Sequence, residues 1–187
     1  KKLATQMKWV ENHSDHHAIY TDEIWVRNGV RVNAMNKHRK YSGDIFCYCL
    51  PLCIISPSSV LLHAELLREV GGFDESMPVC EDYDLWLRIA KRFPFHFIAE
   101  KLIVKRGGHE DQLSRKFWGM DRWRVHALEK LLQENRINED QRDWVVAMLI
   151  EKCGILSSGY GKRGKSQGEE HYRNLAVRYT GLVEDFL

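Results

Sequence analysis

No stretch of this sequence is apolar for long enough to cross a membrane. The longest candidate, residues 45–55, is well short of the ~20 residues that a membrane-spanning helix needs, and Pro51 interrupts it. The opening residues, Lys1 and Lys2 followed by an amphipathic pattern, do not have the features of a secretory signal. We therefore expect a protein without a membrane-spanning segment.

The sequence also lacks a marked excess of one charge. Its formal net charge is +2 over 187 residues, which is too small for the strong positive field of a nucleic-acid-binding surface. Against this near-neutral background, Trp118 and Trp123 fit helix packing better than stacking on bases. We therefore expect no nucleic-acid partner.

Cysteine is scarce and irregularly spaced. The chain has five cysteines, namely Cys47, Cys49, Cys53, Cys80 and Cys153. Cys47 and Cys49 are separated by one residue, whereas zinc sites use longer gaps and a second ligand cluster. The odd number without a regular framework indicates reduced thiols. We expect a cytoplasmic location, at the membrane surface if the protein is peripheral.

The first 115 residues mix strand and helix patterns. Asn28-Gly29 is a turn signal between two β-type segments, so we expect a hairpin there. The apolar run of residues 47–56 is typical of a buried strand, and residues 60–70 have helical spacing that ends at Gly71-Gly72. The other expected elements are a helix over residues 3–12, a helix capped by Asp82 and ending near residue 92, and strands over residues 95–99 and 102–105.

From residue 116 onward only helical patterns remain. Apolar residues recur at helical spacing from Trp118 to Leu132, and further helices are expected over residues 139–157 and 167–185. Strands mixed with helices and then helices alone indicate an α/β region followed by a separate helical one. We therefore divide the chain into residues 1–115 and a helical C-terminal extension, residues 116–187.

Three carboxylates, Glu81, Asp82 and Asp84, crowd the start of one expected helix. Mutual repulsion disfavours ionisation of the group, whereas the helix N-terminus favours negative charge. A carboxylate in this position can accept the proton of an attacking hydroxyl, which is the task of a general base. The alternative is a plain helix cap, since acidic residues are common in first turns, and local spacing alone favours that alternative.

A second candidate is the loop that contains His109. Gly107 and Gly108 precede it and allow the backbone to approach a ligand closely. The imidazole could bind a divalent metal or a phosphate oxygen, and Lys105 and Arg106 add positive charge suited to a diphosphate. The alternative is a solvated polar loop, which is the more common setting for an isolated histidine.

The order of the motifs resembles a known family. Ile55-Ser56-Pro57-Ser58-Ser59-Val60 is followed by Val70-Gly71-Gly72-Phe73-Asp74-Glu75 and then by Glu81-Asp82-Tyr83-Asp84-Leu85-Trp86-Leu87-Arg88. This succession resembles the second half of the family-2 glycosyltransferases, and His109 to Ser114 looks like their later loop. The resemblance covers roughly residues 1–115. It implies a partial GT-A fold, the nucleotide-diphospho-sugar transferase fold, followed by an α-helical tail.

The resemblance also implies roles for individual residues. Members of this family are usually inverting enzymes that use a nucleotide-diphosphate sugar with Mg²⁺ or Mn²⁺. Asp82 would then be the catalytic base and Glu81 would support it or meet the acceptor, while His109 would help to hold the metal or the diphosphate. The remaining residues that we expect to contact substrate are Asp84, Ser58, Ser59 and Arg106.

The sequence departs from the family pattern at its start. The segment Lys2-Leu3-Ala4-Thr5-Gln6 resembles the one that follows the family's metal-binding Asp-x-Asp motif, and neither that motif nor a nucleotide-binding half precedes it. A divalent metal binds poorly without its main carboxylates. We therefore expect a truncated chain that has little or no transferase activity alone.

Two other classes of function stay open at this stage. One is a non-catalytic interaction module derived from such a domain, with the helical extension binding a partner. The other is a metal-dependent hydrolase that uses Asp82, Asp84 and His109. For the transferase we expect a nucleotide-diphosphate sugar and a sugar or lipid-linked acceptor as partners, and self-association is an open expectation.

Overall fold

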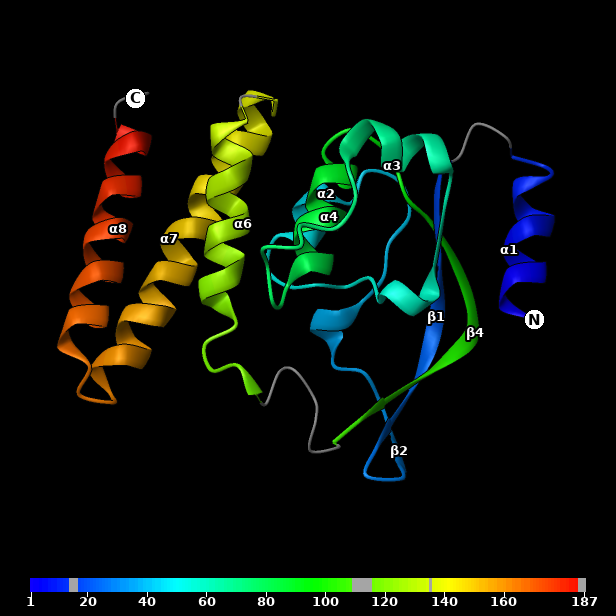
Figure 1. Ribbon diagram of the computed structural model, residues 1–187, viewed down its shortest axis with the longest axis horizontal. Coiled ribbons are helices and arrows are strands. Elements are labelled where there is room, and N and C mark those ends of the chain that lie inside the picture. Colours follow the sequence, from blue (N-terminus) through cyan, green and yellow to red (C-terminus); the bar gives the residue numbers. More distant parts are fainter. Residues whose placement is uncertain (14–16, 109–115, 135, 185–187) are drawn as a thin grey trace. The chain divides into compact units, whose positions relative to one another are not determined.

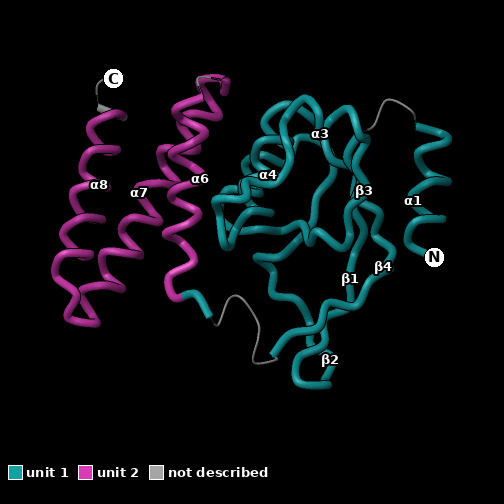
Figure 2. The backbone as a smooth tube through the Cα atoms, in the orientation of Figure 1, with its two compact units in different colours: residues 1–117 teal, residues 118–187 magenta. Residues whose placement is uncertain are grey.

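The computed structural model describes residues 1–13, 17–108, 116–134 and 136–184. The chain divides into two compact units, residues 1–117 and residues 118–187 (Figure 2). The first unit contains a sheet and helices and the second contains helices, so the α/β class expected from the sequence is confirmed.

The sheet of unit 1 is centred on strand β1 (Ala18–Arg27). Strand β2 (Val30–Val32) and strand β3 (Val60–Leu62) both pair with β1 in antiparallel orientation, and β4 (His96–Gly107) pairs with β1 in parallel orientation (Figure 1). The β1–β2 hairpin confirms the prediction from Asn28-Gly29. Both turn residues have positive φ, 49° and 80°, as a two-residue type I′ turn requires.

Three segments differ from the sequence prediction. Residues 96–99 and 102–105 belong to one strand, β4, and not to two, and Phe95 precedes its start. Residues 47–56 do not form a strand, since α2 (Phe46–Cys49) is a short helix whose Cys49 N–H bonds to the Ile45 carbonyl at 3.1 Å. The predicted helix over residues 60–70 is β3 followed by α3 (Ala64–Val70), because the first three residues pair with β1. Tertiary pairing and burial outweigh local spacing at all three places.

The core of unit 1 is built around α4 (Glu81–Ala90), whose residues from Tyr83 onward are all buried. The largest fully buried side chains around it include Tyr20, Phe46 and Phe95. The prediction that Asp82 caps this helix is wrong. The N-cap is Cys80, at φ 62°, and Asp82 is the second helical residue, where its Oδ1 accepts a hydrogen bond from the Tyr83 N–H at 2.7 Å.

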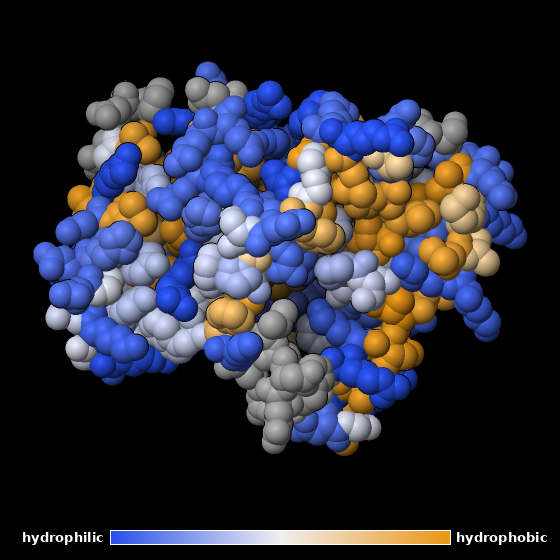
Figure 3. All heavy atoms as spheres, viewed as in Figure 1, coloured by the Kyte–Doolittle hydropathy of each residue, from blue (hydrophilic) through white to orange (hydrophobic). Residues whose placement is uncertain are grey.

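The remaining helix of unit 1 is α1 (Lys2–Val10), joined to the sheet by the buried Gln6 side chain. Gln6 donates from Nε2 to the Ser59 carbonyl at 2.9 Å. On the face shown in Figure 3, apolar surface gathers over the sheet and α1. Exposed apolar side chains on these elements are Leu3, Met7 and Val104.

In its described residues, unit 2 contains the helices α6 (Asp121–Gln133), α7 (Glu139–Gly161) and α8 (Ser166–Glu184). Helix α7 begins with a capping box in which Asn138 and Gln141 bond to each other's backbone N–H groups. Gly168 of α8 lies so close to the Tyr160 ring that a Cβ would meet it at 2.1 Å, so only glycine fits there. Of the helices described in either unit, none is long and apolar enough to span a bilayer.

Candidate functional site

Asp82 is at the N-terminal end of α4, partly exposed, and its two carboxylate oxygens have different partners. Oδ1 accepts from the Tyr83 N–H at 2.7 Å, and Oδ2 accepts from the Cys53 thiol at 3.3 Å. The thiol is also within 3.1 Å of the Ile55 carbonyl. Each carboxylate oxygen has a second lone pair, so Asp82 is oriented by the protein and can still accept a proton from a ligand.

Helix α4 also holds the segment on which Cys53 lies. The Tyr83 hydroxyl donates to the Leu50 carbonyl at 2.6 Å, and the Trp86 indole N–H donates to the Ile55 carbonyl at 3.0 Å. These two bonds, one turn apart on α4, place residues 50–55 relative to the helix start. The orientation of Asp82 therefore depends on packing between α4 and this irregular segment.

One further contact connects this segment to the sheet. Lys105 of β4 donates from Nζ to the Ser56 hydroxyl at 3.0 Å, and the same Nζ lies 5.2 Å from the centre of the Trp25 ring on β1. The Trp25 indole N–H in turn donates to Glu23 at 2.8 Å. Asp82, the segment that ends at Ser56 and one face of the sheet thus form a connected structure.

Glu23 is buried and forms an ion pair with Lys40. Lys40 lies 3.5 Å from Glu23, with side-chain exposures of 6% and 3%. Burial lowers the pKa of Lys40, and the Glu23 carboxylate acts in the opposite direction. The ion pair joins Lys40, in the loop that follows β2, to Glu23 on β1, two residues before Trp25.

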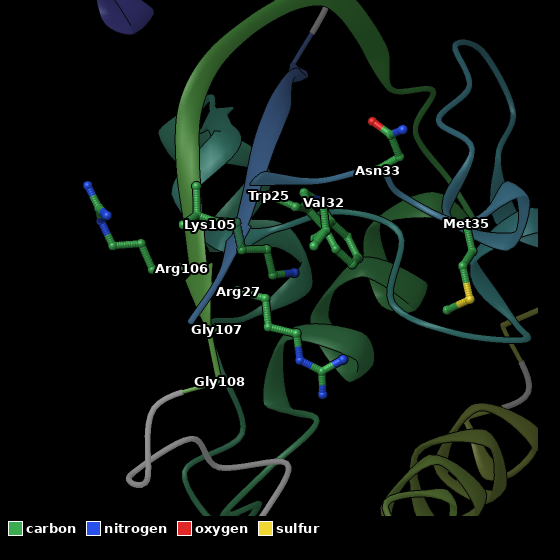
Figure 4. A pocket seen from close by; sticks show the side chains of 10 residues that line it. Trp25, Arg27, Val32, Asn33, Met35, Lys105, Arg106, Gly107 and Gly108 are labelled. Carbon is green, nitrogen blue, oxygen red and sulfur yellow. The ribbon is translucent and has the colours of Figure 1, made fainter. Parts of the chain in front are cut away.

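A cavity of about 390 Å³ opens at the ends of β1 and β4, beside the hairpin (Figure 4). Its lining residues are Trp25, Val26, Arg27, Val32, Asn33, Met35, Lys105, Arg106, Gly107 and Gly108. Lys105 and Arg106, as neighbours on a strand, leave β4 on opposite sides (Figure 4). Lys105 is on the side of Trp25, and the Arg106 side chain points away from it.

Gly108 was expected to let the backbone approach a ligand. In the structure it lies against the hairpin turn, where an added Cβ would be 2.0 Å from Asn28 Oδ1. The Asn28 N–H also bonds to the Gly107 carbonyl at 3.2 Å. The glycine therefore fits β4 against the turn, and at φ 90° it also adopts a backbone conformation that other residues rarely take.

Asp84 has a buried partner within the fold. It is 2% exposed, and its Oδ2 accepts two bonds from Arg88, each at 2.9 Å. Arg88 also donates to the carbonyls of Val70 and Gly72, at 2.6 and 2.7 Å. Asp84 and Arg88 thus hold the end of α3 and the Gly71-Gly72 turn against α4. These contacts give Asp84 a structural role within the described residues.

The two serines differ in position. Ser59 is fully buried, and its hydroxyl donates to the Ser56 carbonyl at 2.7 Å. Ser58 is exposed, and its carbonyl accepts from Lys2 Nζ at 2.9 Å. Both lie just after Ser56, which Lys105 contacts, but neither side chain bonds to Asp82 in the described structure. Ser58 is the one of the two that a ligand can reach.

The metal-binding prediction rests on residues that are not placed. His109 lies outside the described residues. Among the residues that are described, no group of three or more histidines, cysteines, aspartates or glutamates could hold a metal ion.

Sequence reasoning missed two parts of this site. The sequence predicts only a reduced thiol at Cys53, and no local pattern indicates that it meets Asp82. Trp25 lies in the first β-type segment of the predicted hairpin, and the sequence predicts no functional role for it. Glu23, Trp25 and Arg27 alternate along one strand and therefore share one face of it, which is the pattern that could have indicated a site there.

The contact between Cys53 and Asp82 predicts slow alkylation of this thiol. Burial and the Asp82 carboxylate raise the pKa of Cys53 well above its usual value. Only the thiolate reacts, and each unit of increase lowers its fraction about tenfold at pH 8. We expect Cys53 to react with iodoacetamide at least ~10-fold more slowly than an unstructured cysteine, as measured by peptide mass spectrometry.

Asp82→Asn should accelerate this labelling, because it removes the carboxylate that disfavours the thiolate. Asp140→Asn is the matched control, since Asp140 is likewise the second residue of its helix, α7. An equal labelling rate in the wild type and in Asp82→Asn would show that the thiol and the carboxylate are not in contact.

Comparison with known proteins identifies the family of the chain. The chain is 39% identical over 69 residues to an uncharacterized glycosyltransferase of Rickettsia felis, an alignment that covers 36% of this chain and 11% of the relative. A Rickettsia conorii glycosyltransferase is 41% identical over the same length, with the same coverage. A Rickettsia bellii glycosyltransferase is 39% identical over 117 residues, or 58% of this chain and 16% of the relative.

The chain thus spans between 11% and 16% of the length of these three relatives. Residues 22–135 match the sequence profile of the family described as "Glycosyltransferase like family 2". The matched region includes the second part of β1, the segment around Cys53, and all of α4, β4 and α6. This chain belongs to the family-2-like glycosyltransferases.

Proposed function

We propose that the protein transfers a sugar from a nucleotide-diphosphate donor to an acceptor hydroxyl, with Asp82 as the general base. The observation that carries this proposal is the setting of Asp82 in a family-2-like chain. The carboxylate is partly exposed, at a helix N-terminus, and held by the Tyr83 N–H and the Cys53 thiol. That is the arrangement that a base needs to be ready before the acceptor binds.

In the proposed reaction the acceptor hydroxyl gives its proton to Asp82. The hydroxyl oxygen forms a bond to the anomeric carbon while the bond to the diphosphate breaks on the opposite side. The diphosphate takes the electron pair of the broken bond, and the anomeric configuration inverts in one step. The Cys53 and Tyr83 contacts reduce the reorganisation of Asp82 during this step.

Other residues near Asp82 and at the end of β4 are proposed to contact the substrates or to shape the site. Glu81 is partly exposed next to Asp82 and is proposed to meet the acceptor, and Ser58 is exposed two residues after Ser56. Arg106 and His109 are proposed to meet the donor phosphates. Arg106 lies near the end of β4 and is among the residues that line the cavity. Asp84 is proposed to act through Arg88 on the shape of the site.

The remaining parts of the proposal concern the whole protein. We propose a GT-A type fold for the complete catalytic domain, a divalent cation bound by residues other than those described, and a sugar or lipid-linked acceptor. These rest on family membership and on the match over residues 22–135.

The direct test is an assay of the full-length protein with a panel of nucleotide-diphosphate sugars and mixed carbohydrate acceptors. We expect release of nucleoside diphosphate that depends on acceptor, and a product whose anomeric configuration is opposite to that of the donor by NMR. Release without any acceptor product would indicate a hydrolase. No turnover with any donor would favour a non-catalytic module.

A further inference from the structure

We propose that the cavity beside Trp25 binds an anionic group, a phosphate or a carboxylate, on the acceptor carbohydrate. This inference rests on the proposed transferase function and adds the chemical class of the acceptor. We call the cavity the Trp25 cavity and define its binding side by Trp25, Arg27, Val32, Met35 and Lys105.

The charge on this side of the cavity is positive. Arg27 and Lys105 both line it, and the described residues that line it include no carboxylate. In the part of the chain that the structure describes, the Arg27 guanidinium has no ion-pair or hydrogen-bond partner. The acidic side chain on this face of β1, Glu23, is already bonded to Trp25 and paired with Lys40. Among the described residues, a bound anion would therefore meet Arg27 and Lys105 without competition from a carboxylate.

The neighbouring His38 is consistent with this positive field. Its ring packs against Trp25 with the centroids 4.8 Å apart. Burial is the main cause that lowers the pKa of His38, and Lys37 and Lys105 lower it further. The lowered pKa favours the neutral form of His38. Among the described residues on the Trp25 side of the cavity, the cations are Arg27 and Lys105.

The other walls of the cavity are apolar. Trp25 and Val32 are register partners on the β1–β2 hairpin and lie on the same face, and Met35 is 59% exposed on the far side (Figure 4). The volume of about 390 Å³ is within the range of small-molecule sites. An aromatic and aliphatic wall beside two cations fits a ring with C–H faces and one negative substituent, as in a sugar phosphate or a uronic acid.

The location favours the acceptor over the donor diphosphate. Lys105 reaches Ser56 at 3.0 Å, and Cys53, in the segment that ends at Ser56, reaches Asp82 at 3.3 Å. The cavity is therefore joined to the base through a short path of contacts. In an inverting displacement the acceptor lies on the side of the base, and the diphosphate leaves on the opposite side. A cation such as Lys105, which is connected to Asp82 through these contacts, is therefore better placed for a negative charge on the acceptor than for the donor diphosphate.

The test is an NMR titration of the 187-residue chain with glucose 6-phosphate, glucuronate, neutral glucose and uridine diphosphate. The variants are Arg27→Gln and Lys105→Gln, with Arg31→Gln as the matched control. Arg31 is exposed on the same hairpin but points to the opposite face from Val30 and Val32 and does not line the cavity. Circular dichroism verifies that each variant is folded, and Arg27→Gln removes no described contact.

We expect the two anionic sugars to bind and to shift the Trp25 indole resonance, with glucose at least ~10-fold weaker. Arg27→Gln should weaken anionic-sugar binding about tenfold, whereas Arg31→Gln should change it less than twofold. Preference for glucose 6-phosphate or for glucuronate distinguishes phosphate from carboxylate as the recognised group.

Three results would overturn the inference. The first is that neither anionic sugar binds at roughly 10 mM. The second is that the Arg27→Gln and Arg31→Gln variants bind the anionic sugars equally well. The third is that Arg27→Gln weakens the binding of uridine diphosphate alone, which would assign the cavity to the donor. The titration contains no donor and measures binding alone. Failure of the transfer chemistry can therefore be separated from failure of the cavity assignment.

Discussion

Asp82→Asn is expected to lower the turnover of the full-length enzyme at least ~100-fold, the usual scale for loss of a general base. Asparagine has nearly the shape of aspartate, and its one side-chain oxygen can still accept from the Tyr83 N–H, while its NH2 group takes the place of the oxygen that faces Cys53. It cannot take a proton from the acceptor. The loss should appear in kcat, with little change in the apparent affinity for the donor. Steady-state kinetics with donor and acceptor varied separately measures both.

The matched control is again Asp140→Asn. Asp140 is exposed at the second position of α7, so the change in charge and the position in the helix are the same. We expect wild-type turnover for this variant. Near-normal turnover of Asp82→Asn, with the protein folded, would assign the base to another residue and leave the Cys53 contact as a structural feature only.

Arg88→Met is expected to lower the free energy of unfolding of unit 1 by about 3–5 kcal/mol, the range for breaking a buried ion pair from one side. The substitution leaves Asp84 charged and 2% exposed, and it removes the donors to the carbonyls of Val70 and Gly72. Methionine fills much of the same volume, so most of the effect is electrostatic. Denaturant unfolding followed by a probe in unit 1 measures it, because the two units can unfold separately.

Arg92→Met is the control for this prediction. Arg92 pairs with Glu69, but the two side chains are 37% and 47% exposed, so the pair should contribute less than about 1 kcal/mol. The double variant Asp84→Asn with Arg88→Met should recover part of the loss, since no unpaired charge remains. Equal destabilisation by Arg88→Met and Arg92→Met would contradict the structural role assigned to Asp84 and Arg88.

The features that could be predicted from the sequence are those with a local physical cause. Asn28-Gly29 can adopt positive φ at both positions, which most residue pairs cannot, so the hairpin followed from two residues. The helices of unit 2 followed from the helical spacing of apolar residues, which is clearest in α6 and α8, and α7 has a capping signal at its start. The family followed from the order of motifs between Ile55 and Arg88.

The buried segments of unit 1 could not be predicted in this way. Residues 47–56 and 60–62 are apolar with no distinctive period, so their conformation depends on which partner they meet. The first segment is held by Tyr83 and Trp86 of α4, and the second pairs with β1. These contacts join residues at least 31 positions apart in the first case, and no local spacing encodes them.

The site divides along the same line. The local sequence indicated a carboxylate cluster at a helix start and a basic pair at the end of a strand, since residue type and spacing determine both. Only the tertiary structure decided which carboxylate is buried with Arg88 and which faces outward against Cys53. It also placed Lys105 with Trp25 and turned Arg106 away. The reason is that these outcomes depend on distances between β1, β4, α4 and the segment that ends at Ser56, which form only when the chain packs.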